Sequence, residues 1–219
     1  MSKSGKRKTA ILISGRGSNM SALLRAAQDP DFTADISLVI SNRPAARGLK
    51  VAADAGVATL IIDHKQFERR EDFEAALNEA LGAANIDIIC LAGFMRLLTA
   101  DFVAGWRDRM INIHPSLLPA FKGLDTHARV LDAGARISGC TVHFVRAEMD
   151  EGPIIAQAAV PVLPGDSEDE LSARVLKAEH ELYPLALSLL ASGKIRVVND
   201  KVIYEDAKAG DGLLLSPAG

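Results

Sequence analysis

The order in which strand-like and helix-like segments follow one another constrains the fold of this 219-residue chain more than any other feature. In the first half, short apolar runs alternate with longer helical patterns. Such alternation is typical of βαβ units, in which helices cover both faces of a parallel sheet. Because βαβ crossovers are right-handed, we expect an α/β fold with a doubly wound, mostly parallel sheet. The expected strands span residues 9–14, 36–40, 59–62, 86–91 and 110–113, and the expected helices span 19–27, 46–55 and 70–84.

The pattern changes after residue 115. A strand at 139–145, a turn at 149–152 and a further run at 154–162 predict an antiparallel addition to the sheet. Ser167 and Glu170 then form a capping box in front of a long C-terminal amphipathic helix. Pro184 is expected to kink or split this helix, because proline lacks a backbone N–H and crowds the preceding turn. A short hairpin at 195–198 and 202–204 follows.

The length favours a single domain, which we expect at residues 9–205. Residues 1–8 are polar and basic, and they are interpreted as a disordered leader because the apolar run behind them is too short for a signal peptide. Residues 206–219 contain Gly, Ala and Pro and are interpreted as a flexible tail. No run approaches the roughly 20 apolar residues of a membrane span, so we expect a cytoplasmic protein with no membrane partner.

The net charge and the two cysteines indicate which partners and which thiol chemistry to expect. The net charge is −3, and the sequence carries no basic stripe to neutralise phosphates, so nucleic acid is not an expected partner. Cys90 and Cys140 both fall in apolar runs outside any CxxC pattern, which predicts buried, reduced thiols.

A glycine loop follows the first expected strand. Residues 15–19 read Gly-Arg-Gly-Ser-Asn and open a helix, so backbone N–H groups and the helix dipole favour an anion there, with phosphate the natural occupant. The alternative is a turn in which Ser18 or Asn19 caps the helix. Dinucleotide binding fits less well, because Met20 stands where a third glycine is needed and no acidic residue ends the second strand. The loop therefore suits one terminal phosphate of a small substrate.

An amide, an imidazole and a carboxylate form the second candidate site. Asn112 and His114 are two residues apart at the end of the fifth strand, so their side chains share one face of the sheet. Ligands bind at the carboxyl ends of parallel strands, where this pair could donate hydrogen bonds to an oxygen that gains negative charge. Asp150 joins them if its strand lies beside the fifth, and it would then orient His114 as a proton donor.

Structural roles are the alternative for each of these residues. A strand-end histidine, an asparagine before a turn and an Asp-x-Gly-Pro sequence all occur for purely structural reasons. His143 could line the site, but a hydrogen-bonded strand histidine is the favoured interpretation. None of the five histidines is spaced from another His or Cys as zinc ligands are, so no metal is expected.

Taken together, these segments resemble the glycinamide ribonucleotide formyltransferase family over roughly residues 9–204. The matching segments are ILISGRGSNM, LAGFMRLL, INIHPSLLPAFKGLDTH, GCTVHFV, MDEGPII and GDSEDELSARV. The resemblance implies a Rossmann-like formyltransferase fold. It also implies transfer of a formyl group from the cosubstrate 10-formyltetrahydrofolate to the amine of glycinamide ribonucleotide, a one-carbon step of purine biosynthesis, in a monomer or weak homodimer.

The resemblance also implies roles for individual residues. Asn112, His114 and Asp150 would be catalytic. The ribonucleotide would be held by Gly17, Ser18, Asn19 and Glu179. The folate would be held by Arg70, Met95, Arg96, Leu97, Leu98, Asn112, Arg146, Ala147, Glu148, Met149 and Asp150. Two positions depart from the family pattern: Arg16 stands where asparagine is frequent and Ala147 where an acidic residue is frequent.

Two other kinds of protein remain open at this point. One is another formyl-folate enzyme, either a formyltetrahydrofolate hydrolase or a methionyl-tRNA formyltransferase. The chain has the length of neither, because the first usually carries an N-terminal regulatory domain and the second a C-terminal barrel. The other is a non-catalytic nucleotide-binding module, against which the intact Asn112, His114 and Asp150 set argues.

Overall fold

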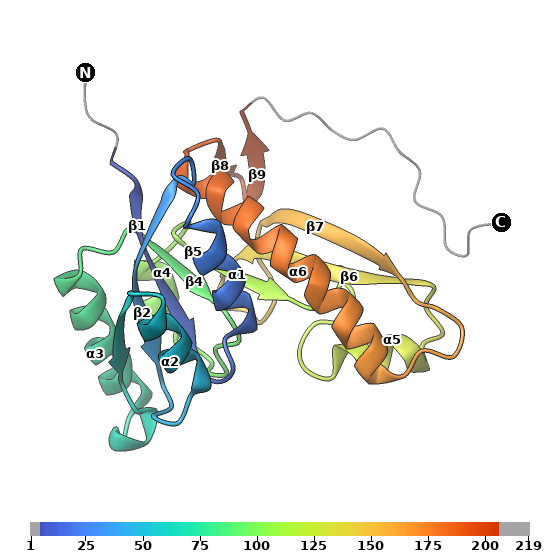
Figure 1. The fold of residues 1–219 in the computed structure, drawn as a ribbon, viewed down its shortest axis with the longest axis horizontal. Helices are drawn as coiled ribbons and strands as arrows, with labels where there is room; N and C mark the ends of the chain where they lie inside the picture. The colour runs from blue at the N-terminus through green and yellow to red at the C-terminus, as the bar shows by residue number, and fades with distance from the viewer. Residues whose placement is uncertain (1–4, 206–219) are drawn as a thin grey trace.

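A seven-stranded sheet organises the computed structural model, which describes residues 5–205 (Figure 1). The strand order is β3-β2-β1-β4-β5-β6-β7; β1 to β5 pair in parallel, and β6 and β7 are antiparallel additions. The strands are β1 (Arg7–Ile13), β2 (Ala34–Ser41), β3 (Ala58–Ile61), β4 (Ile88–Leu91), β5 (Met110–His114), β6 (Ile137–Phe144) and β7 (Ile154–Pro161). This architecture confirms the predicted doubly wound, mostly parallel sheet with antiparallel C-terminal strands.

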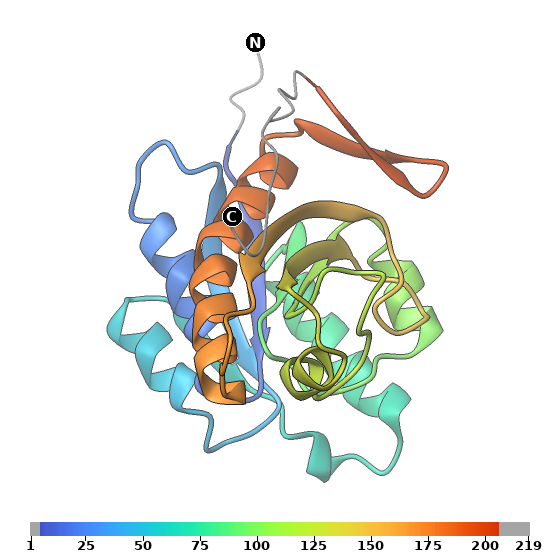
Figure 2. The same ribbon diagram turned by 90° about the vertical axis from the view of Figure 1, so that its right-hand side faces the viewer.

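Helices cover both faces of the sheet because side chains alternate along its strands. Ile11 and Ile13 of β1 belong to one core together with apolar residues of α1 and α6, whereas Ala10 and Leu12 belong to a second core with α3 and α4. Helices α1 and α6 lie side by side (Figures 1 and 2). The helices are α1 (Ser18–Ala26), α2 (Arg47–Asp54), the 3-10 turn η1 (His64–Gln66), α3 (Arg70–Ala83), α4 (Ala100–Gly105), α5 (Thr126–Asp132) and α6 (Glu168–Ala191).

The long helix α6 confirms one local prediction and excludes one of the two outcomes of another. Its capping box is present: the Ser167 hydroxyl accepts a hydrogen bond from the Glu170 N–H, and the Glu170 carboxylate accepts one from the Ser167 N–H. Pro184 does not split the helix, contrary to one expected outcome. Tyr183 and Leu187 on either side of the proline are completely buried, so core packing holds both halves in one helix despite the missing backbone hydrogen bond.

The C-terminal hairpin also forms as predicted. It consists of β8 (Ile195–Val198) and β9 (Lys201–Tyr204), which form a two-stranded sheet of their own after α6 (Figure 2). None of the helices in residues 5–205 is both long enough and apolar enough to cross a membrane. Cys90 and Cys140 are buried free thiols, as expected, and burial raises the pKa of each to about 12.

Several boundaries differ from the sequence-based expectation. Strand β1 begins at Arg7, inside the expected leader, because Arg7 pairs with Ala34 of β2. Strand β4 begins two residues later than expected, since the Ile86 N–H bonds to the Leu81 carbonyl in the turn that ends α3. The short elements η1, α4 and α5 were not expected, because so few residues show no helical period. Residues 1–4 of the leader and all of the expected tail lie outside the described residues.

Candidate active site

The predicted amide and imidazole lie on the sheet face that α6 does not cover. Ile111 and Ile113 of β5 pack into the core shared with α6, so Asn112 and His114 point to the opposite face. His114 is 5% exposed, although it is polar. A buried polar side chain needs hydrogen-bonding partners, and the surrounding loops supply them.

Asp150 reaches His114 across the sheet face. Strand β6 pairs with β5, and its last residue, Phe144, lies opposite Ile111, so the following turn must fold back over the face to reach the end of β5. Asp150 Oδ2 then lies 3.3 Å from His114 Nδ1, with the carboxylate side chain only 11% exposed. The predicted condition is met, since the strand that leads to Asp150 is the neighbour of β5.

A loop after β5 closes over this pair. The Phe121 carbonyl accepts a hydrogen bond from His114 Nε2 at 2.9 Å, and the Gly123 N–H donates to Asp150 Oδ2 at 2.7 Å. Phe121, Gly123 and Asp125 all have positive φ angles of 53° to 83°, a conformation that is costly for residues other than glycine. Both ring nitrogens of His114 therefore face acceptors. The sequence could not predict the Phe121 carbonyl as the acceptor for His114 Nε2, because every residue has a backbone carbonyl.

His143 lies opposite Asn112 in the β5–β6 pair and is more closely involved than the sequence suggested. Its Nε2 is 3.3 Å from Asn112 Nδ2 and 3.9 Å from Asp150 Oδ1. Burial lowers the pKa of the His143 imidazole, and the Phe144 carbonyl and the Asp150 charge act against this shift. The alternation of β6 places His143 on the same face as Thr141, but only the strand register identifies Asn112 as its partner.

The glycine loop leaves the first turn of α1 open. Gly17 occupies the N-cap position with φ of 74°, and no side chain caps the helix, so the alternative in which Ser18 or Asn19 caps it is not observed. The first N–H groups of the helix therefore have no internal acceptor. Asn19 Nδ2 instead donates to Glu179 Oε2 of α6 at 2.7 Å. Burial raises the pKa of the Glu179 carboxyl, and the Asn19 hydrogen bond opposes this effect.

The loop between β4 and α4 contains the predicted segment from Met95 to Leu98. Met95 and Leu97 are 61% and 62% exposed, whereas Leu98 packs on the core beside α3 and α4. The Met95 N–H donates to the buried Ser14 hydroxyl at 2.8 Å, and that hydroxyl donates to Asn42 at 2.6 Å, which fixes the loop to the ends of β1 and β2. Sequence reasoning missed this anchor because serine and asparagine are common in such turns.

The remaining predicted residues lie at the start of α3 and in the turn after β6. Arg70 is exposed at the start of α3, and Ala147, Glu148 and Met149 are exposed in the turn after β6. Arg146 turns away from the cluster: its guanidinium lies 2.7 Å from Asp108 and 3.0 Å from Asp200 in the β8–β9 turn. The side chain of Arg146 is thus already neutralised, which separates it from the other residues of its segment.

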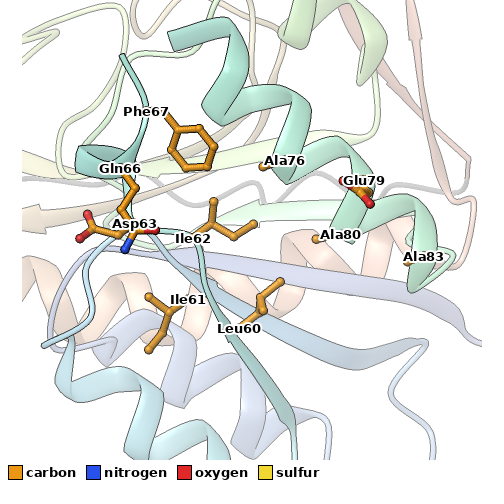
Figure 3. Close-up of a pocket in the computed structure, with 10 residues that line it drawn as sticks. All are labelled: Leu60, Ile61, Ile62, Asp63, Gln66, Phe67, Ala76, Glu79, Ala80 and Ala83. Atoms are coloured by element: carbon orange, nitrogen blue, oxygen red, sulfur yellow. The ribbon is translucent and has the colours of Figure 1, made fainter. Parts of the chain in front are cut away.

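A groove lies away from this cluster, and the described residues contain no group of metal ligands. A groove between β3 and α3 is lined mainly by apolar side chains, with Asp63, Gln66 and Glu79 at its margins (Figure 3). It lies at the β3 edge of the sheet, four strands from β5, and holds none of the predicted site residues. Within residues 5–205, no three His, Cys, Asp or Glu side chains gather as a metal site would require.

Comparison with known proteins assigns the chain to an enzyme family. The formyl transferase family matches residues 7–187. The phosphoribosylglycinamide formyltransferase of Escherichia coli (strain K12) is 42% identical over 95% of this chain and 96% of its own length. The crystal structure of glycinamide ribonucleotide transformylase 1 from Symbiobacterium toebii has a TM-score of 0.89 and 44% identity, covering 92% of this chain and 95% of that chain.

Longer relatives match as well. The trifunctional purine biosynthetic protein adenosine-3 of Gallus gallus is 49% identical over 89% of this chain. The match covers only 19% of that protein. The chain therefore spans between 14% and 20% of the length of the trifunctional relatives.

Proposed function

The chain belongs to the formyl transferase family, among the phosphoribosylglycinamide formyltransferases, and from this membership we propose that it formylates the amine of glycinamide ribonucleotide. The formyl donor is 10-formyltetrahydrofolate, and the product enters de novo purine biosynthesis. The enzyme works on these two small molecules in the cytoplasm, as a monomer or weak homodimer, without nucleic acid or membrane partners.

The observation that carries this proposal is the cluster of Asn112, His114 and Asp150 on one sheet face. Amide and imidazole donors at the end of a parallel strand suit an oxygen that becomes negatively charged. The carboxylate of Asp150, 3.3 Å from His114 Nδ1, keeps the imidazole in an orientation in which Nε2 is the group that meets the substrate. A purely structural cluster would not need three polar side chains in this arrangement.

The proposed reaction is direct acyl transfer. The neutral amine of the ribonucleotide attacks the formyl carbon on N10 of the folate, and a tetrahedral intermediate forms whose oxyanion accepts hydrogen bonds from Asn112 and His114. The bond from carbon to N10 then breaks, and the proton lost by the amine reaches N10 through His114 or a water molecule. His114 Nε2 exchanges its bond to the Phe121 carbonyl for the bond to the substrate. The scheme uses no metal.

We assign the two ends of the site to the two substrates. The open first turn of α1, at Gly17, Ser18 and Asn19, receives the phosphate of the ribonucleotide, since its N–H groups and helix dipole attract an anion. Glu179, held by Asn19, contacts the ribose hydroxyl groups.

The folate lies between the loops that flank β5 and β6. Exposed apolar side chains at Met95, Leu97 and Met149 cover its rings, and backbone groups near Arg96 and Leu98 satisfy its polar edge. Arg70, Ala147 and Glu148 line the outer rim. Arg146 contributes its backbone, because its side chain is held by Asp108 and Asp200.

Turnover of 10-formyltetrahydrofolate, followed by absorbance with and without glycinamide ribonucleotide, tests the proposal. We expect turnover only with the ribonucleotide, and a loss of about 10²- to 10⁴-fold in kcat for His114→Ala. His180→Ala, a histidine on α6 outside the cluster, is the matched control and should keep wild-type activity. Turnover without any amine would indicate a hydrolase instead, and no turnover under either condition would favour a non-catalytic binding module.

A further inference from the structure

We propose that His143 is a positioning residue for formyl transfer, because its unprotonated Nε2 fixes the orientation of the Asn112 side-chain amide. In that orientation one amide N–H bonds to His143, and the second N–H is left to meet the oxyanion. The inference rests on the proposed function for its catalytic meaning, but the arrangement itself depends only on the contacts among three residues of β5 and β6.

The backbone places the two side chains together. Asn112 and His143 are directly opposite each other in the antiparallel β5–β6 pair, so their side chains share the face of the candidate site. The distance between Asn112 Nδ2 and His143 Nε2 is 3.3 Å. The pairing of β6 with β7 shifts register between Val142 and His143, and such bulges re-aim side chains next to active sites.

The contact made by Nδ1 determines which ring nitrogen of His143 carries the proton. Nδ1 lies 2.9 Å from the Phe144 carbonyl oxygen, which can only accept, so Nδ1 must donate. In a neutral imidazole the second nitrogen then has a lone pair and no proton. Burial lowers the pKa of His143, which favours the neutral ring, and His143 is 2% exposed.

The state of His143 then determines how the Asn112 amide is turned. An amide has one end that donates two hydrogen bonds and one end that only accepts. With an unprotonated Nε2, the donating end must face His143, and this leaves the second N–H of Asn112 free. If the amide were reversed, two acceptors would face each other, and the oxyanion would meet a carbonyl oxygen. His143 thus selects the only orientation in which Asn112 can stabilise negative charge.

The charged neighbours of His143 make its neutral form important. Asp150 Oδ1 lies 3.9 Å from Nε2, and His114 carries the other contact to the same carboxylate. A proton on His143 Nε2 would turn the ring into a donor toward Asp150 and remove the acceptor that Asn112 uses. The hydrogen bond from Asn112 to His143 therefore needs a neutral His143, while His114 is the residue that contacts the Asp150 carboxylate.

Kinetics of three variants test the proposal. His143→Leu removes the acceptor, and we expect kcat to fall roughly 10- to 100-fold while both KM values stay within about twofold. Removing an oxyanion donor altogether lowers kcat about 10²- to 10³-fold. The loss of kcat in Asn112→Ala is therefore the upper limit for the loss in His143→Leu. His143→Gln keeps an acceptor oxygen at a comparable reach and should retain kcat within about threefold. The thermal midpoint of each variant reports any loss of folding.

A double-mutant comparison separates positioning from a structural role. If His143 acts through Asn112, His143→Leu should reduce kcat less than about twofold in an Asn112→Ala background. An equal loss of kcat in both backgrounds would overturn the proposal. A loss of activity in His143→Gln as large as that in His143→Leu, with both variants folded, would also overturn it.

Nitrogen-15 NMR of the wild-type chain provides an arm that does not depend on turnover. We expect His143 to carry its proton on Nδ1 at neutral pH. In His143→Leu the chemical shifts of the Asn112 side-chain amide protons should move toward the values of a solvent-exposed amide, and in His143→Gln they should move less. A proton on Nε2 would refute the positioning role even if the enzyme transfers formyl groups. Conversely, a proton on Nδ1 in the NMR experiment supports the contact between His143 and Asn112 even if the turnover assay rejects the proposed function.

Discussion

Replacement of Gly152 by alanine should disable the site through a backbone collision. Gly152 follows Asp150 in the turn after β6, and a Cβ atom there would lie 1.9 Å from the Phe144 carbonyl oxygen. Because the obstacle is backbone, it cannot rotate away. Real Cβ atoms almost never approach another atom closer than 3.0 Å, so the turn must move by about 1.1 Å.

The size of this movement sets the expected effects. A misplacement of about 1 Å can cost on the order of 10²-fold in rate, and the shift would displace Asp150 from its present position 3.3 Å from His114. The Phe144 carbonyl also accepts from His143, so the shift disturbs both ends of the cluster. Overpacking of this kind should also lower the free energy of unfolding by about 1–3 kcal/mol.

Two other glycines give matched controls. Gly139→Ala would place Cβ 2.0 Å from the Ala158 carbonyl, at the end of the β6–β7 pair remote from the Asp150 turn. It should destabilise the protein comparably, as measured by urea unfolding, while kcat per folded molecule falls much less. Gly82→Ala, in α3 with nothing within 4 Å, should be neutral or stabilising. If Gly152→Ala keeps wild-type kcat, the reasoning about the turn is wrong.

Other predictions concern separate parts of the molecule. Asn19→Ala should raise KM for the ribonucleotide roughly tenfold and leave KM for the folate unchanged, because it frees the buried Glu179 carboxylate beside the phosphate loop; equal changes in both KM values would contradict this. Ser167→Ala should reduce the free energy of unfolding by about 1 kcal/mol in urea titrations, with kcat unchanged. The folded-state pKa of Glu179 is raised, so the folded protein holds the proton more tightly than the unfolded chain, and stability should decline as pH rises from about 4.5 through the folded pKa. Glu179→Gln should remove that part of the pH dependence, and identical stability profiles for the two proteins would refute the assignment. Arg146→Ala should change the folate KM less than about twofold, because its guanidinium is bound to Asp108 and Asp200.

The sequence predicts the sheet and the strand that carries Asn112 and His114 well because these depend on local patterns. Apolar runs and helical periods define β1 to β5, and two-residue spacing alone puts Asn112 and His114 on one face. The capping box at Ser167 follows equally from spacing. The sequence could not decide whether Pro184 splits α6, because the burial of Tyr183 and Leu187 that holds the helix together is a tertiary effect.

What the sequence could not give are contacts that depend on strand register and loop paths. The pairing of Asn112 with His143 requires the β5–β6 register, and the Phe121 carbonyl requires the path of a loop with positive φ angles. The ion pairs of Arg146 are a third example. Its guanidinium is bound to Asp108 and Asp200, which are distant in the sequence, and no local pattern indicates this pairing.

The hydrogen bond between Asn19 and Glu179 joins residues that are 160 positions apart. At about 5–20 residues per second, the ribosome needs roughly 8–32 s to synthesise the stretch between them. Throughout that time α1 has been made but lacks α6, against which it packs. A nascent chain can therefore have its first parallel strands in place and still be unable to complete the Asn19–Glu179 contact. This contact forms only when α6 has been released from the ribosome and has docked on α1.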